Sequence, residues 1–358
     1  MEKLKKIAIV TPSLNIGGAE KVLVDLATTL NNNEFKVKIF ALDKPKENQF
    51  TQILKDNNIE FIFIRCVGNF IKNYRAFSKQ IKEFGPSLVH THMDFTYGTL
   101  WARLNSVPFV YTIHSQPYRI FCNKKYKYFL KSVLSKRDII TAVSPIINKE
   151  LVDILSLKSK QVVTIFNPVT VENPVIRNKK GEEIIFTNVA RFHKVKNHPL
   201  LLKSFALLLK DFPNARLKLA GDGENRNQLE NLANDLGITQ NVDFLGNVSN
   251  VPELLKKSDV FVLSSDTEAM PISVLEAMAQ SLPIVSTNVG GVPDIVTNNG
   301  MLVKKGSDIE LSKAMLTLAL DSDLRRKYGA NSYDNVQKFK AQNIALEYEK
   351  LYKSMVRG

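Results

Sequence analysis

Residues 259–296 read DVFVLSSDTEAMPISVLEAMAQSLPIVSTNVGGVPDIV, and this stretch decides the fold that we expect. It opens with a short apolar run rich in β-branched residues, which is typical of a buried parallel strand. Pro271 suits the first position of a helix, because its missing N–H group would be unpaired there in any case. The pattern predicts a strand at 259–263, a loop at 264–267, a helix from Pro271 to about Gln280, a strand at 282–286 and a glycine-containing turn at 288–293.

The start of this predicted helix suits an anion. A helix that begins at the carboxyl end of a parallel strand directs free N–H groups and a positive dipole end toward that edge of the sheet. Glu268 precedes the helix and Glu276 lies inside it. One carboxylate can therefore lie beside the phosphates of a ligand while the other accepts from two vicinal hydroxyls of a ribose. Two glutamates eight positions apart also occur by chance, so the interpretation depends on the strand–helix context.

The segment from Glu268 to Glu276 resembles the E-x7-E signature of the retaining glycosyltransferases of family four. The resemblance implies the GT-B fold, an α/β fold in which two Rossmann-like domains face each other across a cleft. It implies that Glu268 lies near the donor sugar and that Glu276 binds the donor ribose. We expect the N–H groups near Ile272 and Ser273, at the helix start, to hold the donor diphosphate. Where the family often has Glu-Gly-Phe-Gly, this chain has Glu-Ala-Met-Pro, a departure in the loop that would surround the sugar.

Length and composition indicate a folded protein of two domains. The chain has 358 residues, of which 44% are hydrophobic and 23% charged, too many for one ordinary core and too apolar for disorder. Its two cysteines, Cys66 and Cys122, form no C-x-x-C motif, which fits a reducing cytoplasm and argues against a thiolate metal site. The first apolar run, 7–10, is too short for a signal peptide, and no stretch reaches transmembrane length. We expect a cytoplasmic location.

The positive charge is concentrated in the first half of the chain. The net charge is +14, and residues 1–170 hold 25 Lys and Arg against 13 Asp and Glu. The densest segment, 117–137, contains seven basic residues, no acidic residue and five aromatic residues. Such a segment suits nucleic acid, an anionic membrane or a phosphate-bearing acceptor, and it also suits a solvated basic face whose aromatic rings pack inward. The chain carries no helix-turn-helix, zinc-finger or RNA-recognition signature, so we expect no nucleic acid partner.

The first domain begins as a Rossmann-like sheet does. A strand at 7–10 and a helix at 19–30 flank a loop that ends in Gly17 and Gly18. These glycines allow the backbone to approach a ligand, although a plain tight turn would use them too. The loop resembles the opening loop of family-four glycosyltransferases, where it faces the donor phosphate or the acceptor. Further strands are predicted at 37–42, 61–64, 87–90, 109–112 and 138–142, with a basic amphipathic helix at 70–84.

Three histidines, His90, His92 and His114, are predicted on loops that follow these strands. His-x-His suggests a metal, yet no third ligand stands at a helpful spacing, so we expect none. The resemblance implies that His114, in Tyr-Thr-Ile-His-Ser, approaches the donor sugar, and it leaves the roles of His90 and His92 open. Ser144 and Asn167 are further candidates near the domain boundary.

The second domain is predicted to follow a linker at 173–183. Its first strand, 184–189, leads into a turn that carries Arg191 and Lys196. Two cations five positions apart at a strand-to-helix turn can reach one pair of phosphates. The alternative, two unrelated surface cations, is less favoured because of their position in the turn. The resemblance implies that both bind the donor diphosphate, and that the backbone near Val248 receives the base. Strands are also predicted at 217–220 and 242–245, with helices over 301–335 and a last helix at 342–356.

We therefore expect domains at 1–172 and 173–340 and a C-terminal helix at 341–358 that crosses back to the first domain. The implied enzyme moves a hexosyl or hexosaminyl group from a nucleotide-sugar, a UDP-sugar in most of the family, to a carbohydrate or lipid-linked acceptor hydroxyl in bacterial polysaccharide or glycolipid assembly. It would retain anomeric configuration without a metal or cofactor. Two alternatives stay open: a nucleotide-sugar epimerase of the same fold, and a non-enzymatic nucleic-acid-binding protein.

Overall fold

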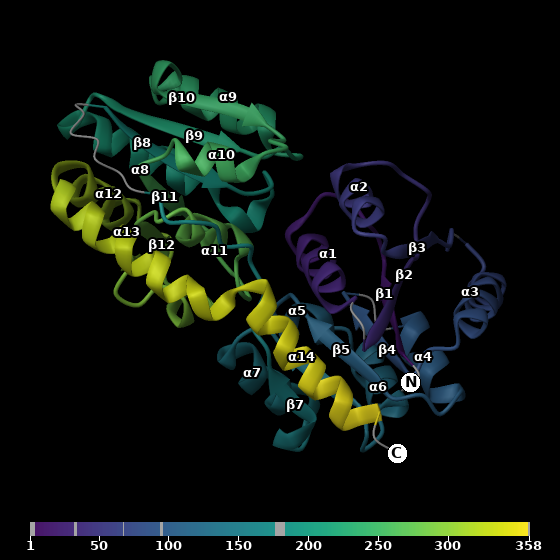
Figure 1. The fold of residues 1–358 in the computed structure, drawn as a ribbon. Helices are drawn as coiled ribbons and strands as arrows, with labels where there is room; N and C mark the ends of the chain where they lie inside the picture. The colour runs from purple at the N-terminus through teal and green to yellow at the C-terminus, as the bar shows by residue number, and fades with distance from the viewer. Residues whose placement is uncertain (1–3, 32–33, 67, 94–95, 176–182, 357–358) are drawn as a thin grey trace. The chain divides into compact units, whose positions relative to one another are not determined.

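The computed structural model describes residues 4–31, 34–66, 68–93, 96–175 and 183–356 (Figure 1). The chain divides into two compact units. Unit 1 is Met1–Pro168 together with Phe339–Gly358, and unit 2 is Val169–Lys338. The sequence predicts boundaries after residues 172 and 340, and the 176–182 part of the predicted linker lies outside the described residues.

Unit 1 contains, within the described residues, a seven-stranded parallel sheet in the order β3-β2-β1-β4-β5-β6-β7. The strands are β1 (Lys5–Thr11), β2 (Phe35–Ala41), β3 (Glu60–Phe63), β4 (Leu88–His92), β5 (Phe109–Ile113), β6 (Ile139–Ala142) and β7 (Val162–Thr164). β4 and β5 are buried along their whole length, as strands in the middle of a helix-covered parallel sheet are. The strand order reverses between β1 and β4, which is where sheets of this kind bind ligands.

The helices of unit 1 are α1 (Gly18–Leu30), α2 (Gln49–Asp56), α3 (Phe70–Phe84), α4 (Thr96–Leu104), α5 (Pro117–Phe121), α6 (Lys124–Val133), α7 (Pro145–Leu155) and α14 (Ala341–Val356), with the 3-10 turn η1 (Ser159–Gln161). The basic amphipathic helix α3 has the bounds that the sequence predicts. The Asn69 side chain caps its start and Gly85, in the left-handed region, ends it.

The C-terminal helix α14 (yellow in Figure 1) completes the core of unit 1. Its residues Ile344 and Tyr348 belong to the same buried cluster as Ile9 of β1 and Leu23 of α1. Residues from the two ends of the sequence therefore share one core, in which α14 packs beside α1.

Unit 2 has, in the part of the chain that the structure describes, a six-stranded parallel sheet in the order β10-β9-β8-β11-β12-β13. The strands are β8 (Ile184–Val189), β9 (Ala215–Ala220), β10 (Val242–Gly246), β11 (Val260–Leu263), β12 (Ile284–Thr287) and β13 (Gly300–Val303). The order reverses between β8 and β11, so the loops after these two strands flank the switch point.

The helices of unit 2 are α8 (His198–Asp211), α9 (Arg226–Asp235), α10 (Val251–Lys256), α11 (Ile272–Ala279), α12 (Asp308–Leu320) and α13 (Ser322–Val336), with the 3-10 turns η2 (Lys194–Lys196), η3 (Thr239–Asn241) and η4 (Val292–Asp294); η5 (Gln337–Phe339) follows α13. Phe205 of α8 and Met315 of α12 pack in one buried cluster with Phe186 of β8. This core supports the sheet beneath the predicted site.

The prediction of helices throughout 301–335 is wrong at its start, because Gly300–Val303 forms the edge strand β13. Gly300 makes this pairing possible. A Cβ atom at that position would lie 2.1 Å from the backbone oxygen of Ile284. The short strand β7 is likewise absent from the predicted elements. Among the described residues, no helix combines the length and the hydrophobicity that a membrane span requires.

Candidate active site

The turn after β8 carries both predicted phosphate-binding cations of unit 2. Arg191 is exposed and forms no ion pair with a described residue, whereas Lys196 is half-buried at the end of η2. Two glycines hold this turn against the loop after β9. A Cβ atom at Gly221 would lie 2.1 Å from the Ala190 oxygen, and one at Gly223 would lie 2.5 Å from the Phe192 oxygen. Both glycines have positive φ angles, +139° and +159°, so this close approach of two backbones requires them.

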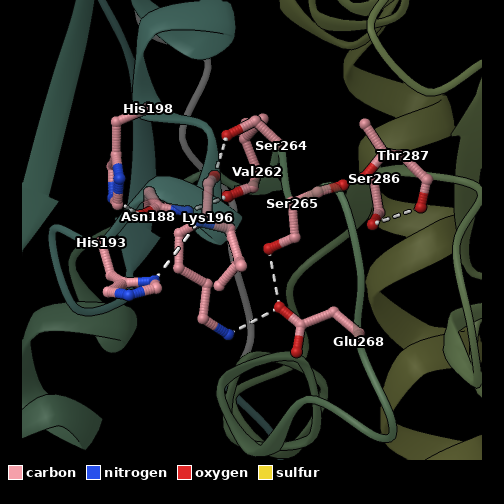
Figure 2. A network of polar contacts seen from close by, with 11 residues as sticks. Asn188, His193, Lys196, His198, Val262, Ser264, Ser265, Glu268, Ser286 and Thr287 are labelled. Atoms are coloured by element: carbon pink, nitrogen blue, oxygen red, sulfur yellow. Dashed lines mark hydrogen bonds and ion pairs between the residues drawn. The ribbon is translucent and has the colours of Figure 1, made fainter. Parts of the chain in front are cut away.

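Lys196 and Glu268 bond each other directly. The sequence predicts that Lys196 binds the donor phosphates and that Glu268 lies near the donor sugar. The Lys196 Nζ atom lies 2.6 Å from Glu268 Oε1. The Ser265 hydroxyl donates to the same oxygen at 2.6 Å, so Oε1 accepts two hydrogen bonds (Figure 2). Glu268 is buried, and Oε2 bonds none of the described residues. That oxygen is the one free to accept from a ligand.

Backbone and amide contacts join the loop after β8 to the loop after β11. The Asp266 N–H group donates to the Val195 oxygen at 2.8 Å, and the Asn197 side chain donates to Asp266 Oδ1 at 3.0 Å. The Ser264 hydroxyl donates to the Lys196 oxygen at 2.9 Å (Figure 2). The Lys196 backbone is therefore fixed by the neighbouring loop, and only its side-chain end is adjustable.

Beneath these loops, the buried Asn188 side chain of β8 joins the neighbouring strand β11 to His198 of α8. The Asn188 Nδ2 atom donates to the Val262 oxygen at 2.7 Å, and Asn188 Oδ1 lies 3.1 Å from His198 Nε2. Burial lowers the pKa of His198 to about 4, so the ring is neutral at physiological pH. Its one proton is then on Nε2, because Asn188 Oδ1 can only accept. The Asn188 contacts and the Ser265 contact were not predicted from the sequence. Polar residues at the ends of apolar strands could have indicated them.

Helix α11 starts without a side-chain cap. Pro271, predicted at the first helical position, is instead the N-cap residue with φ −73° and ψ 118°, and the helix ends at Ala279. Proline has no hydroxyl or carboxylate with which to cap the first amides, so the N–H groups of Ile272 and Ser273 lack the usual intramolecular acceptor. Glu276 lies one turn further along the helix and is half-buried. The helix start is therefore open to an external anion.

The remaining predicted residue of unit 2, Val248, follows β10 and is half-buried. Gly246, at φ +65°, precedes it, and its oxygen accepts from the Gly221 N–H group at 2.7 Å. The predicted residues of unit 2 thus all follow carboxyl ends of strands of one parallel sheet. Lys196 and Glu268 are in direct contact, and the loops after β9 and β10 are bonded to each other.

In unit 1, the predicted glycines stand at the start of α1, as N-cap and first helical residue. The start is occupied by a carboxylate of the same helix. A Cβ atom at Gly17 would lie 2.5 Å from Glu20 Oε2, and the Ser13 hydroxyl donates to Glu20 Oε1 at 2.9 Å. Gly17 therefore makes room for Glu20, a residue that the sequence analysis missed. The negative carboxylate makes this helix start better suited to hydroxyl groups than to a phosphate.

The histidines of unit 1 are placed differently from the prediction. His90 and His92 lie inside β4 and not on a loop, and both are fully buried; only His114 follows its strand. His92 Nδ1 lies 2.9 Å from His114 Nε2. Burial lowers the pKa of His90 to about 3 and that of His114 to about 4, and the pKa of His92 also falls well below its usual value. All three rings are therefore neutral at physiological pH.

Two lesser candidates of unit 1 differ in what they contact. Ser144 caps helix α7 by accepting from the Ile147 N–H group at 3.5 Å, which is a structural role. Asn167 is buried and hydrogen-bonds the side chain of His114. No group of His, Cys, Asp and Glu within the described ranges has an arrangement that could hold a metal ion.

Two family models match this chain. The model for glycosyl transferases group 1 matches residues 170–335, and the model for glycosyltransferase family 4 matches residues 16–173. These ranges correspond to the two Rossmann-like units that carry the candidate residues. The chain therefore belongs to the group 1, family 4 glycosyltransferases.

Individual relatives agree over nearly the full length. A glycosyltransferase of Methanocaldococcus jannaschii is 28% identical over 348 residues, which cover 95% of each chain. The GalNAc-α-(1→4)-GalNAc-α-(1→3)-diNAcBac-PP-undecaprenol α-1,4-N-acetyl-D-galactosaminyltransferase of Campylobacter jejuni is 27% identical over 361 residues, 97% of this chain and 98% of that protein. The solved structure of Anabaena HepE in complex with UDP-glucose has a TM-score of 0.84 at 18% identity, covering 98% and 99% of the two chains. These matches confirm the GT-B fold class.

Proposed function

We propose that this glycosyltransferase moves a sugar from a UDP-sugar to an acceptor hydroxyl with retention of anomeric configuration. The observation that carries the proposal is the Lys196–Glu268 contact, three residues before the uncapped start of α11. A cation and two free N–H groups suit a diphosphate, and the unbonded Glu268 Oε2 suits a sugar hydroxyl. Both requirements of a nucleotide-sugar are met within one pair of loops.

The Lys196 ammonium can bind phosphate without leaving Glu268. An ammonium has three N–H donors, and Glu268 uses one of them. The remaining two face whichever anion enters beside the helix start. Arg191, exposed on the same turn, would supply a second cation, and Glu276 would accept from the ribose hydroxyls. Positive charge that is fixed before the ligand arrives stabilises a diphosphate as it leaves, so the proposed mechanism needs no metal.

In the proposed reaction, the bond between the anomeric carbon and the diphosphate oxygen breaks on the same face where the acceptor oxygen bonds. The acceptor proton passes to the departing phosphate oxygen, which balances the charges. Because the departing phosphate oxygen takes the acceptor proton, this front-face route uses no protein nucleophile. His114 of unit 1 is the residue that we propose to contact the donor sugar.

Relatives support the choice of substrates. The Anabaena structure holds UDP-glucose, and the name of the Campylobacter enzyme states transfer of N-acetylgalactosamine to an undecaprenol-linked glycan. We therefore propose a hexosyl or hexosaminyl transfer to a carbohydrate or lipid-linked acceptor, in bacterial polysaccharide or glycolipid assembly. No cofactor is required, since the nucleotide-sugar is itself a substrate.

A membrane contact on the cytoplasmic side fits such an acceptor. The basic segment forms α5 and α6, where Tyr118, Tyr126 and Tyr128 are 54%, 49% and 66% exposed. These three rings therefore lie at the surface, whereas Phe121 is buried and Phe129 is half-buried. Exposed lysines interleave with these tyrosines, and this combination suits the interface of an anionic membrane.

Incubation with UDP- and GDP-sugars, with and without lipid-linked glycan acceptors, tests the function. We expect UDP release that depends on acceptor, a product with retained configuration, and a raised unfolding temperature with the true donor; a ligand at a hundred times its Kd adds about 2.7 kcal/mol. Conversion of a donor to an isomer without acceptor would instead establish the epimerase. Binding of nucleic acid with no transfer activity would overturn both.

A further inference from the structure

The histidines of unit 1 belong to one polar network on a single face of the sheet. In the parallel pair β4·β5, His92 stands opposite Thr112 and His90 opposite Val110. Alternate residues of a strand share a face, so His90, His92 and Thr112 project to the same side. Tyr352 of α14 reaches this side as well, since its hydroxyl lies 2.6 Å from His90 Nδ1.

The contacts of His90 fix where its proton lies. His90 Nε2 is 2.6 Å from Thr112 Oγ1. Among the described residues, His90 is the one hydrogen-bond partner of the buried Tyr352 hydroxyl, so that hydroxyl donates to Nδ1. The His90 proton is then on Nε2 and goes to Thr112, which also bonds Thr141 Oγ1 at 2.6 Å.

His92 lies between two other imidazoles. Its ring centroid is 4.1 Å from that of His90 and 5.1 Å from that of His114, and the planes of the second pair are 21° apart. The anchored His90 ring thus forms one wall of the His92 position. The hydrogen bond between His92 Nδ1 and His114 Nε2, at 2.9 Å, crosses from β4 to the loop after β5.

A count of protons assigns the direction of that bond. Each neutral imidazole has one N–H group. A buried N–H group without a partner costs more than a buried lone pair without one, so the His92 proton lies on Nδ1, which His114 faces, and not on the unpartnered Nε2. His114 Nε2 must then accept, and His92 Nδ1 must donate. The other nitrogen of His92, Nε2, is left with a buried lone pair that meets no hydrogen-bond partner in the described part of the chain.

We propose that His92 is a positioning residue that holds His114 in a single tautomer and orientation through a His92 Nδ1–H···Nε2 His114 hydrogen bond, with His90 and Tyr352 supporting the His92 ring. The use of this bond in catalysis rests on the proposed sugar contact of His114. The bond itself does not depend on that function.

Nitrogen NMR of the full-length protein with 15N-labelled histidine tests the bond directly. We expect a scalar coupling between His92 Nδ1 and His114 Nε2, with the proton attached to His92. His92→Leu should abolish the coupling and leave His114 in a mixture of tautomers, while His193→Gln, which changes a histidine of unit 2, should alter neither signal. A proton found on His114 Nε2, or no coupling in the wild-type protein, would overturn the proposal.

The catalytic consequence has its own readout. His92→Asn keeps a side-chain N–H donor near the position of Nδ1, whereas His92→Leu keeps none. We expect His92→Leu to lower kcat by about 10- to 100-fold, because a displaced contact group costs rates of that order, with little change in KM, and His92→Asn to restore part of the loss. Equal kcat in both variants would exclude positioning. Absence of transfer by the wild-type protein would count against the proposed function, and the NMR result would still stand.

Discussion

In unit 2, Lys196 Nζ and Glu268 Oε1 lie 2.6 Å apart, although the residues are 72 positions apart in the sequence. The contact links the loop after β8 to the loop after β11 and is largely shielded, since the Glu268 side chain is 8% exposed. Removal of the cation would leave a buried carboxylate without a counter-charge, which is costly. Lys196 therefore carries a structural role in addition to its proposed role toward phosphate.

Replacement of Lys196 and Arg191 by alanine should separate these two roles. Each variant is expected to lose about 2–4 kcal/mol of transition-state stabilisation, measured as a fall in kcat/KM. Lys196→Ala should also lower the free energy of unfolding in urea by about 3 kcal/mol. Arg191→Ala, whose side chain is exposed and unpaired among the described residues, should change it by less than about 0.5 kcal/mol. Near-wild-type turnover of both variants would refute the assignment.

Gly221→Ala tests the contact between the loops after β8 and β9. The new methyl group would meet the Ala190 backbone oxygen at 2.1 Å, so we expect the variant to be destabilised by more than about 3 kcal/mol and to lose donor binding. Gly237→Ala is the matched control, because its φ angle is also positive and nothing lies within 4 Å of the new atom. It should cost about 1 kcal/mol. Equal melting temperatures for the two variants would show that the loops can separate freely.

The buried histidines predict a fall of stability in mild acid. The ordinary pKa of a histidine is 6.5. Burial lowers the pKa of His90 to about 3, and it also lowers the pKa of His92 well below the ordinary value. Below pH 6.5 the unfolded chain binds protons that the folded chain excludes, so the free energy of unfolding should decrease as the pH falls from 6.5 to 5. Each such histidine contributes up to about 1.4 kcal/mol per pH unit. His90→Gln should have a shallower slope in urea unfolding; an unchanged slope would contradict this account.

Vesicle sedimentation tests the proposed membrane contact of α5 and α6. We expect binding to vesicles with anionic phospholipid at low salt, weaker binding at high salt, and none to neutral vesicles. Replacement of Lys124, Lys125 and Lys131 by glutamine should reduce binding by about 100-fold, at about 1 kcal/mol per basic residue. Glutamine at the exposed Lys203 and Lys210 of unit 2 should have no effect. No binding of the wild-type protein at low salt would exclude the contact.

Local patterns in the sequence predict most of the elements that carry the site. Apolar runs located the strands before Lys196 and Glu268, and Pro271 marked the start of α11 within one residue. The error at Gly300–Val303 has a physical reason. Four residues are too few to show a period of two or of 3.6, and what makes this segment a strand is the approach of the Ile284 backbone, which lies sixteen positions earlier.

Side-chain contacts between different strands and loops could not be predicted in the same way. The Lys196–Glu268 bond, the Glu20 carboxylate beside Gly17 and the His92–His114 bond depend on which strands are neighbours. Periodicity reports which face of an element is buried, and not which side chain of another element it meets. His90 and His92 illustrate this limit. They were predicted on a loop, but the hydroxyls of Thr112 and Tyr352 satisfy His90 inside the sheet.

The placement of α14 determines the order in which the protein can fold during synthesis. Unit 2 is continuous in sequence, from Val169 to Lys338, and all of its strands are available once that range has left the ribosome. Unit 1 needs Tyr348 and Tyr352 for its core, so its apolar surface stays incompletely covered while unit 2 is being made. The half of the chain that is translated first is therefore the half whose core is completed last.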